Sequence, residues 1–125
     1  MLIVDADKQA KIWNRAAMAG GGSAPEPRDT ALAAALHVHN MIMSGGLDHA
    51  LDVLTPEDFA SAAGGFRYLQ LSDAAELVEQ ALAASEDGVV ELDARHSALI
   101  PRDEVIGRQF AALLQQRPSD FAPTS

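Results

Sequence analysis

The chain has 125 residues, the length of one domain with a modest core, and its 48% hydrophobic content argues against global disorder. Aromatic residues make up only 5% and alanine supplies much of the apolar share, so close-packed helices fit this composition better than sheets. The absence of cysteine excludes disulfides, thiolate nucleophiles and cysteine-based zinc sites.

The net charge of −9 is concentrated in the middle of the chain. Residues 1–28 and 95–125 each contain four bases and three acids, whereas residues 29–94 contain twelve acids and one base, Arg67. Such a segment repels nucleic acid and anionic lipid and attracts basic surfaces, so we expect no direct binding to nucleic acid or membrane. Solubility alone would explain acidic residues, but it does not require their segregation.

The apolar pattern predicts an all-α domain over residues 1–125, an irregular bundle of about five to six helices. Residues 1–28 are expected to form an N-terminal helix, over about 5–18, and a Gly/Pro loop, and residues 29–121 the helical core. A second helix is predicted from residue 29 or 30 to 43. Because that helix is apolar nearly all round, we place it at the centre of the bundle.

The turn Ser44-Gly45-Gly46 is predicted to end that helix, because glycine closes helices, and a short helix follows over residues 47–54. Thr55-Pro56 then predicts a helix start, with the helix running to about residue 69. Within it, Gly64-Gly65 indicates either a close helix crossing or a break.

A further helix is predicted to open at Ser72 and to end at Glu86-Asp87-Gly88. Residues 89–92 are expected to be a helical or irregular link, because a single strand without a partner is unstable. The last helix is predicted over about residues 101–116. Pro118 begins a tail that Phe121 would anchor.

The sequence contains no motif that predicts catalysis, a cofactor or a metal ion. The histidines are His37, His39, His49 and His96, with no His-Glu-x-x-His pattern, and no serine lies in a Gly-x-Ser-x-Gly turn. His39 falls on the apolar stripe and is predicted to be a partly buried structural histidine. Phosphate and calcium loops are also absent, as are a targeting segment and a long apolar run, so we predict a cytoplasmic protein that is not an enzyme.

The turn Ser44-Gly45-Gly46-Leu47-Asp48 and the segment after it resemble the C-terminal helical domain of the DNA-mimic-protein family, whose turn reads asparagine-glycine-glycine-apolar. Residues 65–69, 74–82, 92–99 and 117–121 are similar to its later segments, so the resemblance covers about residues 36–121. Ser44 replaces the asparagine, and His49-Ala50-Leu51 replaces aromatic residues. The resemblance implies a small acidic helical protein that forms a homodimer and occupies the DNA-binding surface of a basic protein.

The acids of the middle segment are therefore the candidate partner-binding residues. Helix neighbours three or four apart lie roughly 5–6 Å from one another, a phosphate-like spacing that Asp48 with Asp52 and the row from Asp73 to Glu79 would provide. The candidates are Asp48, Asp52, Glu57, Asp58, Asp73, Glu76, Glu79, Glu86 and Asp87.

We expect an acidic interaction module whose partner is a basic, DNA-binding protein. One alternative is an immunity- or antitoxin-like inhibitor of a toxin, which predicts a single tight partner. The other is a small hydrolase with buried carboxylates or histidines, which requires a deep polar pocket where histidine and aspartate converge.

Overall fold

The computed structural model describes residues 6–123, which form six α-helices, a short 3₁₀ turn and no strand. The all-α prediction is thus confirmed. The elements in chain order are α1 (Ala6–Ala19), α2 (Pro27–Val53), α3 (Pro56–Tyr68), α4 (Ser72–Ala81), α5 (Glu86–Leu99), α6 (Asp103–Gln116) and η1 (Pro118–Asp120). The predicted first helix began at Asp5, which lies outside the described residues, and the predicted last helix begins two residues later than expected.

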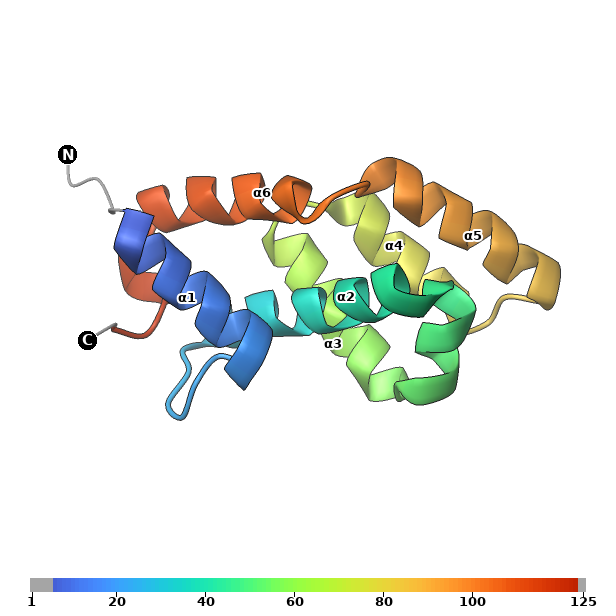
Figure 1. The fold of residues 1–125 in the computed structure, drawn as a ribbon, viewed down its shortest axis with the longest axis horizontal. Helices are drawn as coiled ribbons and strands as arrows, with labels where there is room; N and C mark the ends of the chain where they lie inside the picture. The colour runs from blue at the N-terminus through green and yellow to red at the C-terminus, as the bar shows by residue number, and fades with distance from the viewer. Residues whose placement is uncertain (1–5, 124–125) are drawn as a thin grey trace.

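Helix α2 passes through the middle of the bundle and α3 crosses it, while α1 and α6 lie toward one end and the start of α5 at the other (Figure 1). Leu32, Leu36 and Val38 of α2 are almost completely buried, and this helix contacts α1, α3 and α5. The central position predicted from its apolar circumference is therefore correct.

The helical backbone is interrupted within the Ser44-Gly45-Gly46 segment and a short helical stretch follows, as predicted, although the two stretches are continuous enough to count as one kinked helix. Helix α2 continues to Val53, and the two predicted helices are joined across a kink at Gly46, whose φ of 89° and ψ of 168° are non-helical. Glycine adopts this positive φ without the steric penalty that a Cβ would bring. The Leu47 amide at the kink donates to the Asp93 carboxylate at 2.9 Å, so a distant residue of α5 replaces the lost helical acceptor.

The Glu86-Asp87-Gly88 segment begins a helix, where the sequence predicted an end. Helix α4 closes at Ala81, and the Ser85 hydroxyl accepts a hydrogen bond from the Gly88 amide at 3.2 Å to cap α5. The two acids lie in the first turn, where the helix dipole favours negative charge. Residues 89–92 lie within α5, which is the helical alternative of the prediction.

Helix α3 begins and packs as its sequence predicts. Thr55 and Asp58 form a reciprocal capping box, with distances of 3.0 and 3.1 Å, and Pro56 takes the first helical position. Gly65 faces α2 so closely that a Cβ would stand 2.2 Å from the Ala31 carbonyl oxygen, whereas a Cβ on Gly64 would meet nothing within 4 Å. The pair therefore marks a close helix crossing, and the alternative of a break is wrong.

A buried carboxylate joins the two ends of the described chain. Asp29 is fully buried and accepts hydrogen bonds from Arg15 at 2.8 Å, the Glu26 amide at 3.0 Å and the Ala122 amide at 2.7 Å. The C-terminal segment is thereby held against α1 and α2, and Phe121 is buried as predicted.

Candidate functional site

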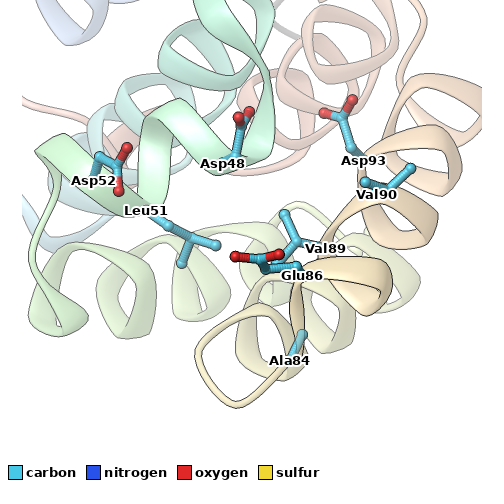
Figure 2. A pocket seen from close by; sticks show the side chains of 8 residues that line it. All are labelled: Asp48, Leu51, Asp52, Ala84, Glu86, Val89, Val90 and Asp93. Carbon is cyan, nitrogen blue, oxygen red and sulfur yellow. The ribbon is translucent and has the colours of Figure 1, made fainter.

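The largest recess with converging acids is a cleft between the C-terminal part of α2 and the first half of α5 (Figure 2). Its volume is about 500 Å³, within the range of sites that hold a small ligand or a few side chains. Four of the lining side chains are carboxylates, four are apolar and none is basic: Asp48, Leu51, Asp52, Ala84, Glu86, Val89, Val90 and Asp93. We call this recess the acidic cleft.

Helical spacing explains why acids and apolar residues share its two walls. Asp48, Leu51 and Asp52 are three and four residues apart, so they occupy one face of α2 beyond the Gly46 kink. Glu86, Val89, Val90 and Asp93 follow the same spacing on α5. Figure 2 shows the Asp48 and Asp93 side chains on the facing helices, with the Glu86 carboxylate extending toward Leu51.

Asp93 has two roles, and the sequence did not single it out. One carboxylate oxygen accepts the Leu47 amide and so fixes α5 to the kink of α2, while the residue also lines the cleft. Its position seven residues after Glu86 was the available signal, because that spacing returns to the same helix face.

The nine predicted partner-binding acids do not gather at one place. Asp48, Asp52 and Glu86 line the acidic cleft, whereas Asp87 is exposed beside it without lining it. Glu57 and Asp58 lie in the first turn of α3, where Asp58 serves the capping box.

The remaining three acids belong to α4. Asp73 lines a separate recess with Ile100, and Glu76 is exposed. Glu79 accepts two hydrogen bonds from Arg67, one of them at 3.1 Å, and these hydrogen bonds lower the pKa of Glu79. Arg67, the single base of the middle segment, is thus paired with Glu79. No basic residue lines the acidic cleft to balance its carboxylates.

Two histidines form a buried chain that the sequence did not predict. His39 and His96 are fully buried, and their Nδ1 and Nε2 atoms are 3.0 Å apart, while His39 Nε2 lies 2.9 Å from a carboxylate oxygen of Asp103. Burial is the main cause that lowers the pKa of His39, and burial together with His39 lowers the pKa of His96 to about 4. His39 was predicted to be structural and partly buried; its burial is complete.

Because both imidazoles are neutral, their hydrogen bonds determine which ring nitrogen carries the proton. His39 Nε2 then donates to Asp103, and His96 Nε2 donates to His39 Nδ1. His96 Nδ1 is left as a buried acceptor without a hydrogen-bond partner among the described residues. Because neither ring has exposed surface, a substrate does not reach them in this conformation.

Two general searches of the described residues gave negative results. Between residues 6 and 123, no group of three or more histidine, aspartate or glutamate side chains is arranged to hold a metal ion. No described helix combines the length and apolar character needed to cross a membrane.

Comparison with known proteins identifies no relative of this chain. No family model matches it, and neither the curated proteins nor the solved structures include a significant match. The molecule is therefore characterised by its own structure, a small helical bundle with an acidic cleft, and the resemblance to DNA-mimic proteins stays a prediction.

Proposed function

We propose that this chain is an acidic protein-interaction module that binds the basic surface of a partner protein through the acidic cleft. The observation that carries the proposal is the sign of the lining charges. All four charged side chains in the cleft are carboxylates, drawn from two helices, and no lysine or arginine lines it. The field of such a recess favours cationic groups and repels anionic ones.

The lining also suits the shape of a basic side chain. Lysine and arginine carry a charged head on an apolar stem. Leu51, Val89 and Val90 offer apolar surface between the carboxylates, and Val90 is 70% exposed. A basic partner would bury stems against these residues and place its charges against Asp48, Asp52 and Glu86. Binding would also relieve the repulsion among the carboxylates.

The proposed partner is a DNA-binding protein. Asp48 and Asp52 are four residues apart on α2 beyond the kink, where helix neighbours have Cβ atoms roughly 5–6 Å apart, a spacing that resembles that of phosphates. A mimic of this kind would be displaced by duplex DNA and weakened by salt. The homodimer implied by the family resemblance forms part of the same proposal, and sedimentation equilibrium measures it.

The test compares two triple variants that remove the same charge from different places. Asp48→Asn, Asp52→Asn and Glu86→Gln neutralise the acidic cleft, and Glu57→Gln, Asp73→Asn and Glu76→Gln neutralise exposed acids elsewhere. Asp93 is left intact because it holds the kink. Basic DNA-binding proteins captured from host lysate at low salt would be purified and titrated against each variant.

We expect the cleft variant to lose roughly tenfold in affinity, because three exposed charge pairs at about 0.5 kcal/mol each, within the usual range of about 0.2–1 kcal/mol, sum to about 1.5 kcal/mol. The matched variant should bind within about threefold of the unmodified chain. Equal losses of affinity in both variants would show that binding depends on the overall negative charge and not on the acidic cleft. An affinity that does not change with salt concentration would contradict the electrostatic proposal. A single partner held through high salt would favour a toxin inhibitor instead.

A further inference from the structure

A second recess has the opposite chemistry. It lies where the start of α2 and the ends of α3 and α6 meet, and its volume is about 290 Å³. Every polar side chain that lines it can donate a hydrogen bond, and none is a carboxylate: Arg28, Arg67, Tyr68, Gln70, Gln116 and Arg117, with Leu113 as the one apolar residue. We call it the arginine pocket. It holds three of the nine basic residues of a chain with a net charge of −9.

The fold brings these arginines together from distant parts of the sequence. Arg28 belongs to residues 1–28, Arg117 belongs to residues 95–125, and Arg67 is the one base of residues 29–94. The hydrogen bonds of Asp29 to Arg15 and to the Ala122 amide hold the two ends of the chain against each other beside the pocket. The hydrogen bonds of the buried Asp29 thus bring Arg28 and Arg117 near each other.

The guanidinium groups differ in how much of their charge is already paired. Arg67 is engaged by Glu79. Arg28 lies over the Tyr68 ring, 3.7 Å from its centroid, and its Nε is 3.6 Å from Asp120. Arg117 makes no ion pair with any residue from 6 to 123. The terminal nitrogens of Arg28 and the whole guanidinium of Arg117 are therefore the donors open to a ligand.

Two residues that line the pocket have unusual local features. The Tyr68 hydroxyl oxygen is buried and has no hydrogen-bond partner in the described part of the chain. Burial raises the pKa of Tyr68, so this hydroxyl keeps its proton and remains a donor. Gln70 has a φ of 62°, which makes it the one non-glycine residue with positive φ in residues 6–123. This residue follows the end of α3, where the Leu71 amide donates to the Phe66 carbonyl at 2.8 Å, so its left-handed backbone belongs to the cap of that helix.

We propose that the arginine pocket binds a phosphate-like oxyanion, either inorganic phosphate or the phosphomonoester of a small metabolite. Guanidinium groups present paired N–H donors that match the oxygens of phosphate, and the amides of Gln70 and Gln116 add further donors to the lining. The volume accepts a phosphate with a small attached group. This site is separate from the acidic cleft and does not depend on the function proposed for it.

The experiment follows the arginine Nε signals in ¹H–¹⁵N spectra of the full chain while phosphate replaces chloride at constant ionic strength. We expect saturable shifts at Arg28 and Arg117 with a Kd of about 1 mM or below. Arg117→Gln should weaken binding roughly tenfold, whereas Arg95→Gln, an exposed arginine outside the pocket, should leave it unchanged.

Two ligands distinguish the sources of the phosphate group. Tighter binding of glycerol 3-phosphate than of inorganic phosphate would assign a phosphomonoester, and the reverse would assign the free ion. Shifts that stay linear to about 20 mM phosphate, or that acetate reproduces, would overturn the proposal. So would an equal loss of binding in Arg117→Gln and Arg95→Gln.

Discussion

The buried pair His39–His96 should make this protein lose stability at mildly acidic pH. In the unfolded chain a histidine titrates near 6.5, whereas in the fold the pKa of His96 is lowered to about 4. Between these values the unfolded state binds more protons than the folded state, so the free energy of unfolding falls as pH falls. The same direction holds for His39, whose pKa burial also lowers.

The size of the effect follows from the shift of His96. Integrating the proton difference from pH 7 to pH 5 between a pKa of 6.5 and one of about 4 gives a loss of about 2 kcal/mol. Asp93 and Asp103 oppose the shift, because each favours the charged form of its neighbouring histidine. The two carboxylates do not cancel the lowering of the histidine pKa values, because desolvation by burial is the largest cause for both rings. For a chain of this size, 2 kcal/mol is a substantial part of the roughly 5–15 kcal/mol of total stability.

The assay is urea unfolding followed by circular dichroism at intervals between pH 7 and pH 4.5. The variant His96→Gln removes the titrating ring while its amide can still donate to His39 Nδ1, so its stability should depend less steeply on pH than that of the unmodified chain. His37→Gln is the matched control, because His37 is exposed on α2, the helix of His39, and its replacement should leave the slope unchanged. A free energy of unfolding that is flat from pH 7 to pH 5, or equal slopes in both variants, would refute the reasoning.

Four further substitutions test the close helix crossing, the buried ion pair and the backbone of Gln70. Gly65→Ala should lower the free energy of unfolding by about 1–3 kcal/mol, since its Cβ would stand 2.2 Å from the Ala31 carbonyl oxygen. Gly64→Ala, where the Cβ would meet open space, should be neutral or stabilising, and equal effects of the two in thermal unfolding would contradict the close crossing. Asp29→Asn should cost about 3–5 kcal/mol by chemical unfolding, because it leaves Arg15 with an uncompensated charge, and a change below about 1 kcal/mol would rule this out. Gln70→Gly should raise stability by up to about 1 kcal/mol by relieving its positive φ, and a lower melting temperature would count against the strain.

Local signals in the sequence predicted the helices that depend on local chemistry. Thr55-Pro56 contains its own cap and start, so α3 begins where expected. The Gly45-Gly46 pair correctly marked a break in the helical backbone, but the sequence did not show that Asp93 of α5 accepts the Leu47 amide there and joins the two stretches into one kinked helix. The decisive contact comes from 46 residues away and has no local signature.

The functional surfaces were harder to predict for the same reason. Glu86 was recognised as a candidate acid, but its companion Asp93 was not, because spacing along α5 does not show which face meets α2. His39 lay visibly on the apolar stripe, yet its contacts with His96 and Asp103 join three helices. Charge segregation identified the acidic middle of the chain. The structure was needed to show that some of these acids line the cleft, that Asp58 caps a helix and that Glu79 pairs with Arg67.

The most direct test of the acidic cleft is to map where a basic partner contacts this chain. Backbone ¹H–¹⁵N spectra would be recorded while a captured, purified DNA-binding protein is added at low salt. The account predicts that the largest changes fall on residues 47–53 of α2 and on residues 84–93, which include the start of α5, and that they disappear in the cleft variant. Changes centred on α1 and α6, or spread evenly over every acidic helix, would contradict it.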